Sequence, residues 1–421
     1  MRLACLFLGV MILYLSLAAN TAAQPVEIVF WHMSWGAAYE SALQEIVDAF
    51  EKENPDIKVR TEVVSWANYV QKFLTAVEGG VPPDVSEGSS YQPIIYAARG
   101  EVMPVDELIA KWQQTGQIDD LVSQNHRNYY MQGHYWAVPA QVDVRGIYYR
   151  KDMFADAGLA EPTTWDELYE TAKKLTKDGV FGFSAQLNRE HPAQQLLLTL
   201  MLQNGTSTFD AKGNLVFDNP RTVQAFEFYN RLFTDTMPPG SVGYDGDQAR
   251  RVFLEGHSAM HFDSPAVIAA VEEAGLSDRV GVLPVLQGPS GDRGTAAWTN
   301  PVMIWRQTKH PEQALRWVEY LTRPENLGKL YNSGRYNLPV FRSQFNLPFI
   351  TSSPVREEAV TKLLPFGHDY SYPGEATPLI PLIEEQYIWT DAVHKMLVEG
   401  MSPSDAVKWA ATRIRHILAD L

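Results

Sequence analysis

Short apolar segments alternate with amphipathic helical patterns along this chain, and this alternation restricts its fold more than any other feature. The run Val26–Trp31 is continuous, β-branched and aromatic, as in a buried strand. Apolar residues then recur every three to four positions between residues 43 and 50, which predicts a helix. This helix has to end at Asn54-Pro55, because the residue before a proline disfavours the α region. Ile57–Val64 is predicted to form a second strand, and a strand, helix and strand in succession is typical of an α/β protein.

The same organisation is predicted further along the chain. Thr164 and Glu167 have the spacing of a capping box, so a helix is expected to begin there and to end by Gly179. Ser402-Pro403 offers an N-cap and a proline at the first helical position, which predicts a C-terminal helix. Strands are predicted over residues 259–262 and 280–286. The fold class is therefore α/β.

The length of 421 residues predicts more than one lobe, since a domain usually holds about 100 to 200 residues. No internal repeat, low-complexity tract or Gly/Ser linker marks a boundary between lobes. We therefore expect the lobes to be joined by several crossings of the chain.

The N-terminal residues have the pattern of a secretory signal peptide. Arg2 precedes an uncharged apolar run, Leu3–Ala19, and the small-residue stretch Asn20–Ala23 predicts a leader of residues 1–23. An uncleaved membrane anchor is the alternative. The single cysteine, Cys5, would leave with the leader, so the mature chain needs no disulfide and has no cysteine for a lipid anchor. No later segment is long and apolar enough to span a membrane.

Charge and motifs exclude several functions. The chain carries 50 Asp plus Glu against 35 Lys plus Arg, a net charge of −15, so a nucleic-acid partner is not expected. Motifs for P-loop, dinucleotide, serine-hydrolase and zinc-protease chemistry are absent. His257 and His261 lie too far apart along a predicted strand to share a metal ion, so we expect no metal and no cofactor. A secreted glycoside hydrolase with two carboxylates stays open, because spacing cannot identify such a pair, and so does a structural or adhesive surface protein.

Aromatic and polar residues follow several of the predicted strands. They occur in His32–Trp35, Ser86–Tyr91 and Trp298–Asn300. In open α/β sheets, ligands bind beyond the carboxyl ends of the strands, so these segments are expected to converge on one cleft. A sugar needs a flat aromatic surface for its C–H face and polar side chains for its hydroxyls. Core packing is the alternative for Trp35 and Trp298, and it is the expected role of four other tryptophans: Trp31, Trp66, Trp165 and Trp409.

Five segments, in this order and spacing, resemble one known family. The most specific is Val138–Phe154 (VPAQVDVRGIYYRKDMF), and the others are Gly80–Val85, Phe253–Met260, Gly281–Pro284 and Lys309–Glu325. They are similar to bacterial extracellular solute-binding proteins of family 1, the maltose-binding type that serves ABC importers. The resemblance covers nearly all of the mature chain.

This resemblance implies the two-lobed periplasmic binding protein fold of type II, with the ligand in the cleft between the lobes. Lobe 1 would comprise approximately residues 24–141 and 297–325, and lobe 2 approximately residues 142–296 and 326–421. The protein would not be an enzyme. It would be a monomer that captures a carbohydrate or related polyol by lobe closure in the periplasm and delivers it to permease subunits of an ABC importer.

The resemblance and the strand ends together give the predicted ligand-binding residues. Asp143 falls on the family's ligand carboxylate beside the hinge, and Asp263 stands where relatives often have an aromatic residue, so it is predicted to accept from a hydroxyl. Glu190 and His191 fall in a region that faces the cleft in relatives. The other predicted contacts are His32, Trp35, Glu87, Ser89, Ser90, Tyr91, Trp298 and Asn300.

Overall fold

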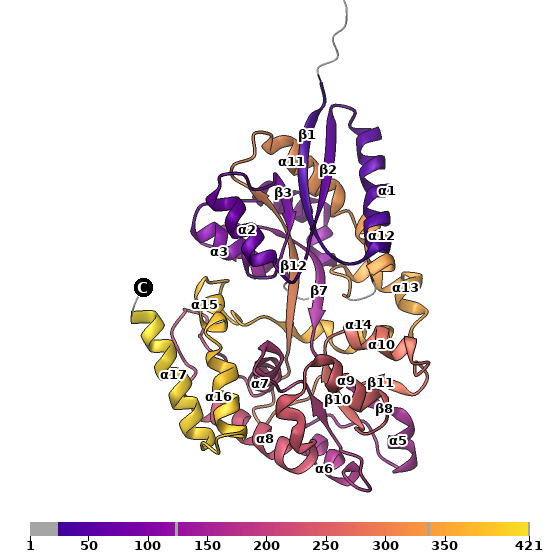
Figure 1. The fold of residues 1–421 in the computed structure, drawn as a ribbon, viewed down its shortest axis with the longest axis vertical. Helices are drawn as coiled ribbons and strands as arrows, with labels where there is room; N and C mark the ends of the chain where they lie inside the picture. Colours follow the sequence, from indigo (N-terminus) through magenta and orange to yellow (C-terminus); the bar gives the residue numbers. More distant parts are fainter. Residues whose placement is uncertain (1–23, 123–124, 335–336, 420–421) are drawn as a thin grey trace, which may run out of the picture.

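The computed structural model describes residues 24–122, 125–334 and 337–419, and two separate sheets organise them (Figure 1). The predicted signal peptide, residues 1–23, lies outside the described residues. The two sheets occupy opposite ends of an elongated molecule, and helices surround each one (Figure 1). The chain is an α/β protein with two lobes, as the sequence predicted.

The first sheet has a parallel core that confirms the predicted N-terminal unit. β1 (Val26–Met33) pairs with β2 (Ile57–Val64) along its whole length. Between them lies α1 (Ala37–Glu53). Asn54 is its C-cap residue, and the backbone N–H of Asn54 donates to the carbonyl of Phe50 at 2.8 Å. The remaining strands of this sheet are β3 (Val85–Glu87), β4 (Val102–Met103), β7 (Val138–Val144), β12 (Thr295–Trp305) and β13 (Gly367–His368).

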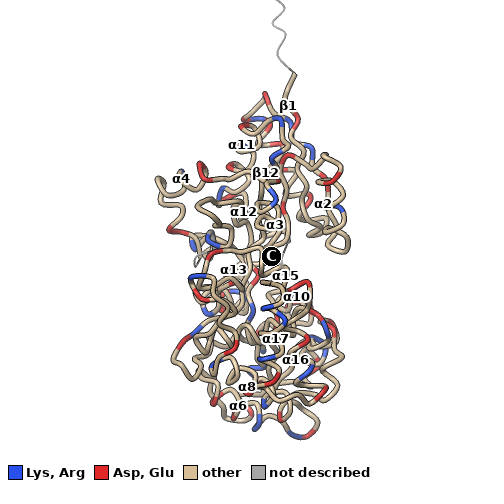
Figure 2. Tube along the Cα trace, turned by 90° about the vertical axis from the view of Figure 1, so that its left-hand side faces the viewer, with Lys and Arg blue, Asp and Glu red and all other residues tan. Residues whose placement is uncertain are grey.

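Helices α2 (Tyr69–Glu78), α3 (Gln92–Ala98), α4 (Asp106–Thr115), α11 (Pro311–Leu321) and α12 (Pro324–Gly334) belong with this sheet (Figure 1; α4 is labelled in Figure 2). Aromatic rings hold α1 and α11 on β1, because the buried Trp317 meets both Phe30 and Phe50 edge-on, with ring centroids 5.6 and 5.1 Å away. Such edge-to-face pairs add to the free energy that burial supplies. A small two-stranded ribbon, β5 (Tyr130–Met131) and β6 (His134–Tyr135), lies beside this region.

The second sheet has the order β11, β8, β10, β9 in the described residues. Its strands are β8 (Gly146–Arg150), β9 (Ser184–Ala185), β10 (Met260–Asp263) and β11 (Val280–Val282). β10 lies one residue beyond the predicted 259–262. The prediction of a strand through residue 286 was wrong: Leu283 still donates to Ile147 at 2.9 Å, but Pro284 has no N–H with which to continue the ladder.

Helices enclose the second sheet. They are α5 (Lys151–Asp156), α6 (Trp165–Leu175), α7 (His191–Gln203), α8 (Pro220–Thr236), α9 (Gly246–Leu254), α10 (Ala266–Glu273), α13 (Pro348–Thr351), α14 (Pro354–Lys362), α15 (Leu379–Glu385), α16 (Ile388–Leu397) and α17 (Pro403–Ala419). Short 3-10 helices span Gln117–Asp120, Asn125–Tyr129, Pro239–Gly243, Arg342–Asn346 and Leu364–Phe366. The predicted capping box at Thr164 and the predicted start of the C-terminal helix at Pro403 are both confirmed.

Two long antiparallel strands, β7 and β12, connect the ends of the molecule (Figure 1). Asp143 lies directly opposite Trp298, and Gln141 lies opposite Asn300. The prediction that Trp298 and Asn300 follow a strand end was therefore wrong, since both lie within β12. A strand that crosses from one lobe to the other presents its middle, rather than its end, to the space between them.

Charged residues of both signs are interspersed over both ends of the molecule (Figure 2). Within the described ranges, no helix combines the length and the apolar character needed to cross a membrane.

Candidate ligand-binding site

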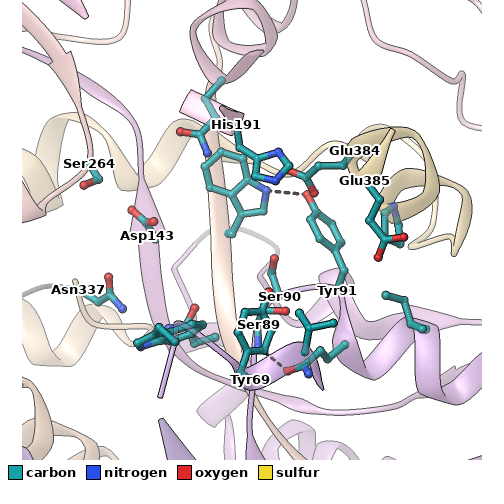
Figure 3. Close-up of a pocket in the computed structure, with 18 of the residues that line it drawn as sticks. Tyr69, Ser89, Ser90, Tyr91, Asp143, His191, Ser264, Asn337, Glu384 and Glu385 are labelled. Atoms are coloured by element: carbon teal, nitrogen blue, oxygen red, sulfur yellow. Dashed lines mark hydrogen bonds and ion pairs between the residues drawn. The ribbon is translucent and has the colours of Figure 1, made fainter. Parts of the chain in front are cut away.

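A cavity of about 1180 Å³ lies between the two lobes (Figure 3). This is slightly larger than the roughly 300 to 1,000 Å³ typical of small-molecule sites. Tyr69 and Ser90 line one side, and His191 and Glu384 lie across from them (Figure 3). The floor is formed by the crossing strands β7 and β12.

An acid, a cation and an indole lie together on this floor. Arg145 Nη1 is 2.5 Å from Asp143 Oδ1, and Arg145 Nε donates to Gln195 Oε1 at 2.6 Å. The same guanidinium lies 5.0 Å from the ring centroid of Trp298, within the range of a cation–π contact. Arg145 thus links the Asp143 carboxylate to the Trp298 ring and to α7.

The indole of Trp298 is held in place by Tyr91, the residue that precedes α3. Its Nε1 donates to the hydroxyl of Tyr91 at 2.7 Å (Figure 3). Asn300 lies two residues further along β12, so it faces the same side of the strand and also lines the cavity. Trp298 and Asn300 are therefore brought to the site by strand alternation.

An aromatic wall, defined here as Trp35, Trp66 and Tyr69, covers the first-lobe side of the cavity. Trp66 meets Trp35 edge-on at a centroid distance of 5.1 Å and meets Tyr69 in the same way at 5.5 Å. The prediction that Trp66 belongs to the core was wrong, because its side chain is only partly buried and lines the cavity. Its position two residues after β2 ends at Val64 is the signal that could have identified it. Trp31 and Trp165 are buried, as predicted.

The second-lobe side carries an acid and a histidine in contact. Glu384 Oε1 accepts from Gln194 Nε2 at 3.0 Å and lies 3.6 Å from His191 Nδ1. Burial raises the pKa of the Glu384 carboxyl to about 8, and the charge of Glu385 adds to this effect. Burial also lowers the pKa of His191. This corner of the cleft therefore favours neutral groups at neutral pH.

Eight of the twelve predicted residues line the cavity together: Trp35, Ser89, Ser90, Tyr91, Asp143, His191, Trp298 and Asn300. His32 and Glu87 do not, because both are buried beneath the aromatic wall. Glu190 is exposed at the residue preceding α7, where it accepts from Gln186 at 2.8 Å.

Asp263 lies in a smaller adjoining cavity of about 80 Å³ rather than in the main cleft. Its carboxylate receives two hydrogen bonds from Arg250, at 2.6 and 3.2 Å, and lies 3.3 Å from His261 Nε2. Burial alone would raise the pKa of Asp263, but the contacts with His261 and Arg250 outweigh it and hold that pKa well below its usual range. A carboxylate engaged in this way has little capacity left for a ligand.

The cavity also has lining residues that the sequence did not indicate as contacts. They are Gly36, Val70, Leu74, Ile95, Tyr96, Arg99, Gln195, Ser264, Ala266, Asn337, Pro381, Glu384 and Glu385. Those on α2, α3 and α15 belong to ordinary helical patterns, which carry no signal for a site. The described residues contain no group of three or more His, Cys, Asp or Glu side chains that could hold a metal ion.

The model of one protein family, described as bacterial extracellular solute-binding protein, matches residues 36–327. This chain belongs to that family. The solute-binding protein is 26% identical over 349 residues to a putative ABC transporter periplasmic-binding protein, YcjN, of Escherichia coli, with 80% of this chain and 77% of the relative covered. It is 26% identical over 230 residues to a mannitol-binding protein of Pseudomonas aeruginosa, with 53% and 51% covered.

Solved structures share the fold of this solute-binding protein. A sugar transporter from Arthrobacter chlorophenolicus with bound laminaribiose has a TM-score of 0.76 at 27% identity, covering 93% of this chain and 99% of that one. The sugar-binding protein MalE of Xanthomonas citri has a TM-score of 0.81 at 21% identity, covering 94% and 98%. These relatives are binding proteins rather than enzymes.

Proposed function

We propose that this solute-binding protein captures a carbohydrate in the cleft between its lobes and delivers it to an ABC importer. The observation that carries the proposal is the combination of the aromatic wall and the Trp298 ring with a polar floor. Aromatic faces suit the C–H surface of a sugar ring, and carboxylate, amide and hydroxyl groups suit its hydroxyls. The names of the relatives, which include binding proteins for sugars and for mannitol, support the same ligand class.

The proposed contacts are the eight predicted residues that line the cavity, together with Trp66, Tyr69 and Arg145. A micromolar site requires about −8 kcal/mol. A few hydrogen bonds at about 0.5 to 1.5 kcal/mol each, with two or three ring contacts of similar size, are sufficient for that affinity. Ligand that touches both walls gains its full set of contacts only when the lobes close, so it shifts the protein toward the closed state.

We place the lobe boundaries within the crossing strands, near residue 141 in β7 and near residue 296 in β12. The expected boundaries also imply a third crossing at about residue 325. We place this crossing after α12 instead, because α12 packs against α1 and so belongs with the first lobe. The protein is proposed to act as a monomer in the periplasm after removal of residues 1–23, and to dock on permease subunits in its closed form. Light scattering of the purified protein tests the monomeric state, and mass spectrometry of its N-terminus tests the removal of residues 1–23.

A thermal-shift screen of the mature chain tests the ligand class. Laminaribiose, maltose, mannitol and ribitol form the first panel, and calorimetry then measures the affinity of each ligand that raises the melting temperature. Trp35→Ala and Trp298→Ala should each weaken binding five- to thirtyfold, which corresponds to about 1 to 2 kcal/mol. Trp409→Ala, outside the cavity, is the matched control. Failure of every carbohydrate to bind would refute the proposal, and release of reducing ends from glycans would instead indicate a glycoside hydrolase.

A further inference from the structure

A buried carboxylate lies directly beneath the aromatic wall. Glu87 ends β3 and is 4% exposed. Its Oε2 accepts from the backbone N–H of Met33 at 2.8 Å and from Trp35 Nε1 at 3.1 Å, and its Oε1 accepts from the hydroxyl of Tyr39. The three donors come from the end of β1, from the loop after it and from α1. One side chain thus ties together the segments that carry the first part of the wall.

The bond to Glu87 decides what Trp35 can offer a ligand. An indole has a single donor, and here the protein occupies it. Trp35 therefore presents its ring to the cavity and no hydrogen-bonding group. Trp66 meets the Trp35 ring edge-on, and Tyr69 meets Trp66 in turn, so the orientation of Trp35 is passed along the whole aromatic wall.

The loop that carries Trp35 has few other constraints. The backbone N–H of Ser34 donates to the carbonyl of Val64 at 2.9 Å. Gly36 follows Trp35 with φ of 99°, and because glycine adopts positive and negative φ about equally well, it restrains the path of this loop little. Burial raises the pKa of Glu87, while the nearby His32 charge and the bonds from Tyr39, Met33 and Trp35 act in the opposite direction. Keeping a carboxylate in this position is costly unless its bonds are made.

We propose that Glu87 is a positioning residue for ligand recognition: it does not touch the solute, but it fixes the orientation of Trp35 and through it the aromatic wall. This proposal rests on the proposed function, in which the wall contacts a carbohydrate. A purely structural role for Glu87 would instead stabilise the lobe without any specific connection to Trp35.

A double-mutant cycle on the full mature chain separates these roles. Glu87→Ala should weaken carbohydrate binding about fivefold, because it frees the Trp35 ring. Trp35→Ala should weaken binding by at least as much, and adding Glu87→Ala to Trp35→Ala should change affinity by less than twofold. A similar loss from Glu87→Ala in both backgrounds would overturn the proposal, and so would an unchanged affinity of the single variant.

Two conservative variants keep the test informative if Glu87→Ala does not fold. In Glu87→Gln the amide oxygen can replace Oε2 and accept from Met33 and Trp35, while the amide NH₂ donates to the Tyr39 oxygen, so affinity should stay within threefold of the original. Trp35→Phe keeps a ring but removes the N–H, and it should weaken binding three- to tenfold. Trp35→Phe with the original affinity would contradict the positioning role.

A matched control and a ligand-free measurement complete the design. Asp84→Ala removes another carboxylate next to the same strand, one that binds Val29 N–H at 2.8 Å and does not line the cavity, so it should leave affinity unchanged. Glu87→Ala should also increase acrylamide quenching of tryptophan fluorescence without ligand, and Trp35→Ala should abolish that increase. If no carbohydrate binds the original protein, the proposed function fails, while unchanged quenching refutes the positioning role itself.

Discussion

Replacing Glu384 with glutamine should make the folding stability of the ligand-free protein less dependent on pH. Burial raises the pKa of this carboxyl from an ordinary value of 4.5 to about 8. Between these values the unfolded chain has released a proton that the folded protein still holds. The free energy of unfolding must therefore fall as pH rises through this interval, and the loss is complete once pH exceeds the folded-state pKa.

The size of the effect follows from the interval. At about 1.36 kcal/mol per pH unit, the loss between pH 4.5 and about 8 reaches about 5 kcal/mol. The Glu384 side chain is 14% exposed, so water relieves part of the penalty of its charged form, and we expect about 2 to 4 kcal/mol. Glutamine carries no charge and can keep the bond from Gln194, so Glu384→Gln should avoid this loss.

Urea unfolding of both proteins at pH 5, 7 and 9 measures the difference directly. The stability advantage of Glu384→Gln should grow by about 2 to 4 kcal/mol from pH 5 to pH 9. His191, whose pKa burial lowers, is present in both proteins, so most of its contribution cancels. Glu385→Gln changes the exposed neighbour on the same helix and removes only the smaller, charge-derived part of the raised Glu384 pKa, so it should reduce the pH dependence less than Glu384→Gln does. A constant difference between Glu384→Gln and the original protein across this range would refute the reasoning.

Three further outcomes follow from single contacts. Thr164→Ala removes an observed capping box and should lower the free energy of unfolding by about 1 kcal/mol in urea, whereas Thr164→Ser should preserve it. Asp263→Asn breaks the pair with Arg250 and should cost about 2 kcal/mol or more at pH 7. Because the folded-state pKa of Asp263 is held low, this cost should shrink as pH falls below about 3.8, where the Asp263 carboxyl of the unfolded chain starts to be protonated while the folded protein keeps its carboxylate; a cost equal at pH 7 and pH 3 would contradict it. Tyr91→Phe leaves the Trp298 N–H without its acceptor and should weaken carbohydrate binding about fivefold by calorimetry, so an unchanged affinity would count against this role.

The parts of the fold that could be predicted are those specified by local signals. The spacing of apolar residues and the Asn54-Pro55 stop defined the first strand, helix and strand, and the Thr164 capping box defined the start of α6. The strand was predicted to extend to residue 286 because the segment 280–286 is almost entirely apolar. It ends at Val282, since Pro284 cannot donate the next ladder hydrogen bond. The antiparallel pairing of β7 with β12 depends on contacts between residues more than 150 positions apart, and no local pattern specifies it.

Local sequence signals also predicted part of the site. Residues after parallel strands, such as Trp35 and Tyr91, could be placed because strand ends share an edge of the sheet. Glu87 was predicted as a contact from its place after a strand, but its three protein donors hold it below the surface. Glu384 comes from a C-terminal helix with no motif, and only the packing of α15 beside α7 brings it to the cleft.

The floor of the cleft differs from its walls in how it is positioned. Asp143 and Trp298 face each other across the β7–β12 pair, and Arg145 and Asn300 each follow two residues later on the same side of their segments. Because side chains alternate along a strand, a register slip of one residue would turn such a group away from the cavity. The floor is therefore fixed by backbone pairing between the strands that join the lobes, while each wall belongs to one lobe. If the lobes close on a solute as we propose, the floor can keep its geometry while the walls approach, so floor contacts set orientation and wall contacts supply the free energy that depends on closure.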